Sequence, residues 1–373
     1  MKYPLSTDYQ TAVKYCKRFV LDPVLVNSMP QQNKYGLVMY SGGYTRVFPM
    51  TVGLEKYALR CWIADVYEAE YRYKSIKKYL NACKINYFVS FDYVKKGILV
   101  NGIIYPVLRM EWAEGLDLKE FIRKHLTQAD ILKQTAKTFL HMTKELHAHK
   151  IAHGDLQHEN IMVQKKGNHI QLVLIDYDSL YIPDFIDMPD HIVGLPAFQH
   201  PTRIGKAKQA LASEKMDYFS ELIIYISLMA FAERPDCWDI FNLEISEGLI
   251  FNEKDFECPE QSKAFSLLKQ LSHPIRVGVD LLKSYCKQTD ISLFIPIEQV
   301  IYGADDSLTK MFDKFEAFSK SVPPPKRHHV PKVKNDNINQ LIQNIKQYSP
   351  PEKAKQPKQE YGVDQLINNI QYV

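Results

Sequence analysis

The stretch AHGDLQHENIMV (152–163) decides the fold assignment of this chain of 373 residues. Between apolar flanks it places an acid and an amide five residues apart, Asp155 and Asn160. A later run, IQLVLIDYDSLYIP (170–183), reads as a strand that ends in acids, with Asp176 directly after its apolar core. Carboxylate and amide oxygens are ligands that Mg²⁺ accepts, and a carboxylate can also accept a proton. The pattern predicts one base and two metal ligands brought together.

Phosphoryl transfer requires groups of this kind, because a base must hold the acceptor hydroxyl while Mg²⁺ bridges the phosphates. Asp155 is then the candidate base, and Asn160 and Asp176 are the candidate metal ligands. The arrangement H-x-D-x-x-x-x-N, followed by a strand and an Asp, resembles the catalytic loop and the D-F-G of protein kinases. The chain is also similar to bacterial kinase-like proteins with YALRCW-type and HGDLQH-type motifs. The resemblance implies ATP and Mg²⁺ as cofactors.

Four further segments extend the resemblance over about 40–300, in the order that protein kinases show. They stand where the glycine-rich loop, the strand leading into the interlobe hinge, the end of the activation segment and a buried helix are expected: YSGGYTRVF (40–48), VLRMEWAEG (107–115), GLPAFQHP (194–201) and MDYFSEL (216–222). In the last segment, Asp217 is expected to brace the catalytic loop.

The resemblance implies an α+β, bilobal protein-kinase-like fold with a small β-rich N-lobe and a helical C-lobe. The local pattern agrees, since short β-like runs surround one helix near 66–82 and helices dominate the later part. The Pro- and Lys-rich end should form a disordered tail. We therefore expect four parts: an N-terminal helical extension (1–35), the N-lobe (36–112), the C-lobe (113–318) and the tail (319–373).

The resemblance also implies a nucleotide site between the lobes. Met110 would be the gatekeeper, and the backbone of Glu111 to Ala113 would meet adenine. The full implied ATP-binding set is Gly42, Gly43, Val47, Ala58, Arg60, Met110, Glu111, Ala113 and Met162.

The cationic position of the third strand departs from the kinase pattern. YALRCW puts Arg60 where a lysine is expected, and arginine is longer and planar, so the replacement is not conservative. Its helix partner should be a glutamate, and Glu68 and Glu70 are the two candidates, with no basis for choosing between them.

The catalytic loop and the metal loop depart as well. Gln157 replaces a second lysine, and Gly154 replaces the Arg before Asp155, so we expect no control through a phosphorylated activation loop. Tyr177 and Asp178 replace Phe-Gly. Asp178 is either a turn acid, which we favour, or an extra metal ligand.

Most histidines are expected to have no catalytic role. His153 should pack inside the C-lobe, and His158 should be an exposed loop residue. Three more should lie on the surface of a helix over 128–149 without acidic partners: His141, His147 and His149. Thr127 and Asp130 are expected to form a capping box for that helix.

Composition excludes several classes of protein. The net charge of +4 gives no indication of nucleic-acid binding, and the basic excess falls in 321–373. The longest apolar run, 218–232, is too short to span a bilayer and contains Glu221, so it should be a buried helix. Six scattered cysteines without CxxC spacing argue against zinc, and with an N-terminus lacking an export signal they favour the cytoplasm.

The tail carries two similar segments, INQLIQNIKQY (338–348) and VDQLINNIQY (363–372), which share Q-L-I-x-N-I. Their apolar residues fall on one helical face, so each could fold as a short helix in a groove of a partner protein. Two copies would add avidity. Docking on the chain's own kinase domain is the alternative.

Three functions remain open. The first is an ATP-dependent Ser/Thr protein kinase with a protein substrate, favoured because Asp155, Asn160 and Asp176 are all present together with GLPAFQHP. The second is a small-molecule phosphotransferase, since HGDL resembles aminoglycoside and choline kinases at this loop. The third is a pseudokinase scaffold that works through its tail, suggested by Arg60 and Gln157. The fold also hosts nucleotidyl transfer.

Overall fold

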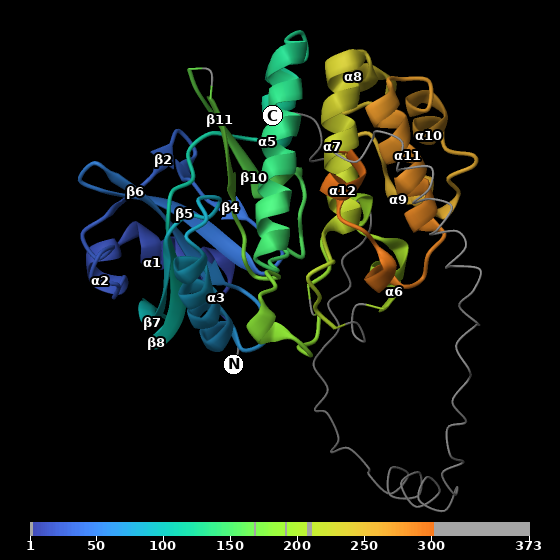
Figure 1. Ribbon diagram of the computed structural model, residues 1–373. Coiled ribbons are helices and arrows are strands. Elements are labelled where there is room, and N and C mark those ends of the chain that lie inside the picture. Colours follow the sequence, from blue (N-terminus) through green and yellow to red (C-terminus); the bar gives the residue numbers. More distant parts are fainter. Residues whose placement is uncertain (1–2, 168, 191, 207–210, 302–373) are drawn as a thin grey trace, which may run out of the picture. The chain divides into compact units, whose positions relative to one another are not determined.

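The computed structural model describes residues 3–301 except 168, 191 and 207–210. The chain divides into two units, 1–312 and 313–373. The second unit lies outside the described residues, and so do both Q-L-I-x-N-I segments and the expected boundary of the tail. The first unit carries every element described below (Figure 1).

An antiparallel sheet forms the N-terminal part of this unit, with strand order β1-β5-β6-β8-β7 and β4 attached to β5. Successive side chains of β6 alternate between its two faces, as a strand requires. On one face Leu59 and Cys61 pack beneath the N-terminal helices α1 and α2; on the other, Ala58 and Trp62 pack with α3. The elements are α1 (Ser6–Lys14), α2 (Cys16–Phe19), β1 (Met29–Pro30), β4 (Tyr40–Ser41), β5 (Thr45–Val52), β6 (Glu55–Trp62), α3 (Ala69–Cys83), β7 (Phe91–Val100) and β8 (Ile103–Glu111).

Two smaller sheets accompany it. One is the hairpin of β2 (Gln32–Asn33) and β3 (Gly36–Leu37). The other has the order β11-β10-β9, from β9 (Leu116–Asp117), β10 (Ile161–Lys166) and β11 (His169–Leu174). Because β10 begins directly after the HGDLQHEN loop and β11 ends two residues before Asp176, this sheet brings the two polar stretches together.

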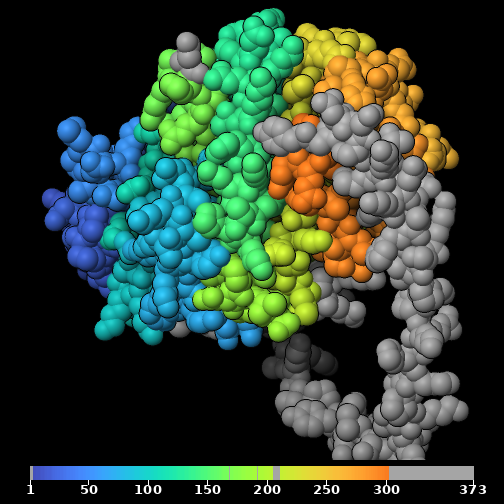
Figure 2. Space-filling model, in the orientation of Figure 1, coloured from blue at the N-terminus to red at the C-terminus, as the bar shows by residue number. Residues whose placement is uncertain are grey.

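Helices make up most of the remainder, as the sequence predicts. The apolar run 218–232 forms α7, which is buried nearly all round and packs against α5 and α11, as expected for a helix without a polar face. Figure 2 shows the light-blue surface of α3 adjoining the green surface of α5, where the Tyr79 hydroxyl donates to the His149 carbonyl at 2.8 Å. The helices are α4 (Leu118–Lys124), α5 (Ala129–Ala148), α6 (Pro201–Lys206), α7 (Tyr218–Glu233), α8 (Cys237–Ile240), α9 (Glu253–Glu257), α10 (Lys263–Leu268), α11 (His273–Cys286) and α12 (Ile297–Ile301), with 3-10 turns η1 (His158–Asn160), η2 (Pro183–Phe185), η3 (Pro196–Phe198) and η4 (Ile291–Leu293).

Two expectations about α5 are wrong. The helix begins after Gln128 without a side-chain cap, so Thr127 and Asp130 form no capping box. His147 is not a surface residue without acidic partners, because its ring nitrogens lie 2.8 Å from Glu221 of α7 and 3.0 Å from Glu298 of α12. Packing of three helices at this point turns an apparently exposed position inward. His141 does lie on the surface, as expected, but it too has an acidic neighbour, Glu145, at 3.9 Å.

Within the described ranges, none of the helices combines the length and the apolar character that crossing a membrane would require.

Candidate active site

The HGDLQHEN loop holds Asp155 and Asn160 against each other. The Asn160 amide nitrogen donates to the Asp155 carbonyl at 2.8 Å and to its Oδ2 at 3.1 Å. Asp155 Oδ1 is buried and has no hydrogen-bond partner. A buried acceptor without a donor is costly, so such an atom in a site calls for an explanation. The Asn160 orientation also turns its amide oxygen away from Asp155.

Asp217 braces this loop, as predicted from MDYFSEL. Its carboxylate accepts hydrogen bonds from the backbone amides of Gly154, at 2.9 Å, and of His153. Gly154 has a φ of +78°, and a Cβ there would lie 2.4 Å from the Ser179 carbonyl oxygen. The loop therefore requires glycine in front of Asp155. His153 is buried, as expected.

The acids after β11 meet the cation of β6. Arg60 Nη2 lies 2.7 Å from Asp176 Oδ1 and 2.9 Å from Asp178 Oδ2, and the arginine is buried. Asp176 has a φ of +66°, which is uncommon outside glycine and aims its side chain at this position. Asp176 and Asp178 thus share one guanidinium.

Two expectations about this region are wrong. Neither helix glutamate pairs with Arg60: Glu70 instead contacts Lys74 and Lys95. Asp178 is not a turn acid, because it is buried and bonded to Arg60. Tyr177 points into the core, where its hydroxyl donates to the Leu174 carbonyl at 2.8 Å. Because Tyr177 is turned into the core, the next residue, Asp178, faces Arg60.

The surroundings separate the two candidate catalytic acids electrostatically. Burial raises the pKa of Asp155 to about 6, with a further contribution from the charge of Asp176. Burial would raise the pKa of Asp176 too, but Arg60 outweighs it and holds this pKa below its usual range. A proton acceptor is most effective with a pKa near the working pH, whereas a metal ligand must be ionised. The two environments match these separate roles.

The implied ATP-binding residues lie on β5, β6 and β8 of the large sheet, in the loops that adjoin these strands, and on β10. In the sheet register, Val47 lies opposite Arg60 and Ala58 opposite Met110. Gly42 and Gly43 form the turn between β4 and β5, where the Gly42 amide donates to the Thr45 carbonyl at 3.0 Å.

The hinge residues follow β8, which ends at Glu111, and Ala113 lies two residues further on. The Trp112 ring lies 6.0 Å from that of Tyr40 on β4, so the hinge meets the first strand of the glycine turn. Met162 lies apart from the large sheet, on β10, opposite Asp117.

The donor set fits a magnesium ion that arrives with a nucleotide. Over the described ranges there is no group of three or more His, Cys, Asp or Glu side chains able to hold a metal ion. Mg²⁺ is usually bound through one or two protein oxygens together with phosphate oxygens and water. Asn160 and the Asp176 carboxylate, whose side chain is 37 % exposed, supply oxygens of this kind.

A buried arginine that the sequence analysis missed orders the segment before α7. Arg203 contacts both carboxylate oxygens of Asp190, at 2.6 and 3.0 Å, and also donates to the Gly154 carbonyl. This bidentate pair ties the GLPAFQHP region to the catalytic loop without a phosphate group. The sequence signal was weak, because Asp190 and Arg203 match no motif.

Gly194 of the same segment lies directly against the candidate base. A Cβ at this position would be 1.8 Å from Asp155 Oδ1 and 2.9 Å from Gln199 Nε2, and both of these atoms are buried without partners. An acceptor and a donor thus stand unpaired around one point next to Asp155.

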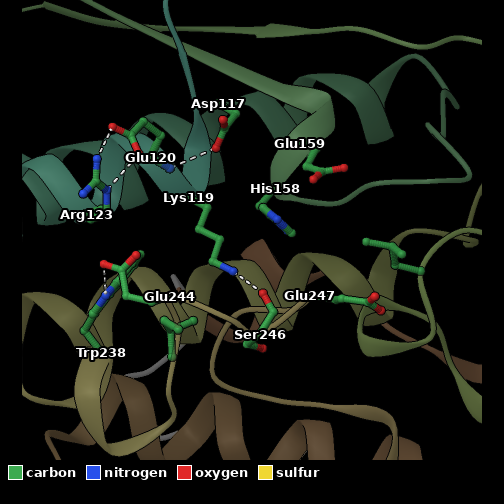
Figure 3. A pocket seen from close by; sticks show the side chains of 12 residues that line it. Asp117, Lys119, Glu120, Arg123, His158, Glu159, Trp238, Glu244, Ser246 and Glu247 are labelled. Carbon is green, nitrogen blue, oxygen red and sulfur yellow. Dashed lines mark hydrogen bonds and ion pairs between the residues drawn. The ribbon is translucent and has the colours of Figure 1, made fainter. Parts of the chain in front are cut away.

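A pocket of about 750 Å³ opens beside this loop, between α4 and the 238–247 region (Figure 3). Figure 3 shows His158 and Glu159 on its upper wall and the Lys119 side chain reaching across to the Ser246 carbonyl. The expected exposure of His158 is wrong, since its ring is buried 5.4 Å from the Phe198 ring. Burial, aided by Lys119, lowers the pKa of His158 to about 4, so this wall is neutral at His158.

A β-rich lobe carrying the Arg60 cation, a helical lobe carrying the braced loop, and two acids between them define a kinase-type fold and site. The model of the protein kinase domain family matches residues 78–289, more than half of the chain. The chain belongs to the protein kinase domain family, and this membership supports a phosphotransferase of the kinase type. No curated protein matches the chain.

The family match begins inside α3, so the glycine turn and Arg60 lie before the matched residues. The sequence departs from the kinase pattern at these same positions.

Proposed function

We propose that this protein is an ATP- and Mg²⁺-dependent Ser/Thr protein kinase, which transfers the γ-phosphoryl group to a hydroxyl of a protein substrate. The observation that carries the proposal is Asp155, whose Oδ2 is held by Asn160 while Oδ1 is buried and unpartnered. A substrate hydroxyl is a donor that would satisfy this oxygen.

The chain's own residues would act as follows. Asp155 Oδ1 accepts the hydrogen bond of the acceptor hydroxyl and then its proton, while the Asn160 amide keeps the carboxylate in place. Asn160 and Asp176 would hold the metal, which neutralises the charge of the phosphates when it is bound. Arg60 keeps Asp176 ionised and supplies a fixed positive charge at the same place.

Two features support a polypeptide as the acceptor. The Arg203–Asp190 pair gives the GLPAFQHP region one fixed position next to the base. The pocket beside Glu159 is lined mostly by charged and polar side chains, which suits an extended peptide chain with polar side chains. The tail segments as docking sites and the cytoplasmic location stay predictions.

The second candidate is a pseudokinase scaffold, and one observation favours it. Arg60 already neutralises Asp176 and Asp178, and the Gly194 backbone lies against Asp155, so the site is closed by the chain itself. No specific contact favours the small-molecule phosphotransferase.

The test is thermal unfolding of the full-length protein with and without MgATP, beside the Asp176→Asn variant. Ligand at about 100 times Kd adds roughly 2.7 kcal/mol to the free energy of unfolding, which is a rise of several degrees in Tm. We expect a rise that requires Mg²⁺ and disappears in the variant. No rise in the wild type would favour the scaffold. Phosphorylation of aminoglycosides or choline but of no peptide library would favour the small-molecule enzyme.

A further inference from the structure

Arg60 is not held by a helix glutamate, which is the partner that the kinase pattern suggests. Its guanidinium contacts two carboxylates and, through Nη1, the Tyr73 hydroxyl oxygen at 3.5 Å. Tyr73 belongs to α3, the helix from which a glutamate partner was expected, and its hydroxyl donates to Asp178 Oδ1. The connection from α3 to the arginine therefore runs through a tyrosine and an aspartate.

The side chains that make this connection are buried and are held in place by their neighbours. The exposed surface of Arg60, Tyr73 and Asp178 is 4, 1 and 6 % of each residue. The Tyr73 ring packs edge-on against Trp62 and Phe91, with centroids 5.8 and 5.7 Å apart, which fixes the direction of its hydroxyl. The neighbouring Arg72 clamps the backbone at Asp178 by donating to its carbonyl at 3.2 Å.

The two glutamates that could have served instead are engaged elsewhere or lie at the helix start. Glu70 contacts Lys74 at 2.7 Å and Lys95 at 3.1 Å. Glu68 is exposed and precedes the first residue of α3 with a left-handed φ of +49°. A planar guanidinium with several donors can bind both aspartates at once, whereas a lysine ammonium is a single point charge.

We propose that Tyr73 and Asp178 are positioning residues for Arg60, which hold it for the phosphates of the nucleotide in the place of a helix glutamate. The inference rests on the proposed nucleotide-dependent function. Asp178 anchors the guanidinium from the buried side, and this leaves the partly exposed Asp176 to serve a metal. α3 contacts Arg60 through the Tyr73 hydroxyl group.

The test compares the binding of MgATP, MgADP and adenosine by calorimetry in the full-length protein. Tyr73→Phe removes one oxygen, and Asp178→Asn keeps the shape but removes the charge. Hydrogen bonds to charged groups contribute more than neutral ones, so each change should weaken MgATP and MgADP about tenfold (about 1.4 kcal/mol). Adenosine, which lacks phosphates, should change less than about twofold. In an Arg60→Met background, Asp178→Asn should add no further loss.

Matched controls lie on the same helix and at the residue that precedes it. Tyr71→Phe, at a 49 % exposed tyrosine, and Glu70→Gln and Glu68→Gln should bind all three ligands as the wild type does. An equal loss for adenosine and MgATP would overturn the proposal, because it would show general damage to the fold. Loss in a glutamate variant would assign the anchor to that glutamate. If the wild type binds adenosine but neither MgATP nor MgADP, Arg60 does not serve the phosphates and this inference is wrong. If the wild type binds none of the three ligands, the proposed function fails as well.

Discussion

Arg60 and His147 are each enclosed with two carboxylates, and the two clusters differ in what surrounds them. In the active-site cluster, Arg60 joins Asp176 and Asp178, which follow the end of β11. In the helix cluster, His147 joins Glu221 and Glu298 where α5, α7 and α12 meet.

Exposure and the nature of the cation separate the two clusters. The Asp176 side chain is 37 % exposed, while those of Glu221 and Glu298 are 2 and 14 % exposed. Arginine stays charged at every accessible pH, but the charge of histidine depends on its partners. The comparison teaches that similar charge pairing can leave different freedom for a ligand: the active-site cluster keeps one carboxylate, Asp176, partly open, whereas the helix cluster is enclosed where three helices pack.

The largest expected effect tests Asp155, the candidate base near the active-site cluster. Asp155→Asn should reduce phosphoryl transfer by about 10²–10⁴-fold, because it removes the base, while MgATP binding persists. Steady-state kinetics on a peptide substrate and calorimetric binding measure the two quantities. A variant that transfers at the wild-type rate would remove Asp155 from the role of base.

A substitution in the helix cluster should instead lower stability and leave the response to MgATP intact. His147→Leu leaves the buried Glu221 and the partly buried Glu298 without a cation, and breaking a buried pair in this way costs about 3–5 kcal/mol of stability. Urea unfolding measures the loss, and the Tm rise caused by MgATP should persist in the variant.

His141→Leu, on the exposed surface of the same helix, is the matched control and should be near neutral. A small loss for His147→Leu would mean that the cluster does not hold a charged histidine.

The two cations should also differ in their response to pH. Burial would lower the pKa of His147, but Glu221 and Glu298 raise it from 6.5 to about 10. A raised folded-state pKa gives stability that is complete below pH 6.5 and is lost as the pH rises toward 10. The difference in unfolding free energy between wild type and His147→Leu should therefore shrink over this window. The contribution of Arg60 to stability should not change with pH over the same window. A constant difference from pH 6 to 10 would contradict the assignment.

The smallest effect concerns the pH profile of activity. The pKa of Asp155 is raised to about 6, and transfer needs the ionised form. We expect kcat/KM on a peptide to be flat above pH 7 and to fall toward tenfold per unit below about pH 6. A profile that stays flat down to pH 4.5 would show that Asp155 is not titrating in the free enzyme.

Much of the fold and part of the site could be predicted because their signals are local. Asp155, Asn160 and the Asp217 brace follow from short spacings in HGDLQHEN and MDYFSEL, and the structure places them in contact with one loop. Gly154 had a local signal as well, although only the Ser179 carbonyl behind it explains why glycine stands there.

Partners far along the chain could not be predicted in this way. From the sequence, Glu68 and Glu70 were the expected partners of Arg60. The structure instead pairs Arg60 with Asp178, 118 residues away, because of the register of β6 and the position at which β11 ends. His147 finds its acids 74 and 151 residues away, and no periodicity within α5 shows them.

The amino-acid sequence by itself determined the family, the two-lobed α+β organisation and the loop that carries Asp155, because motif spacing and hydrophobic period are properties of short segments. Only the tertiary structure decided which acid neutralises each buried cation and which side chains the site keeps unpaired. Charge pairing in a low-dielectric interior depends on atoms within a few ångströms, and packing rather than sequence distance brings those atoms together.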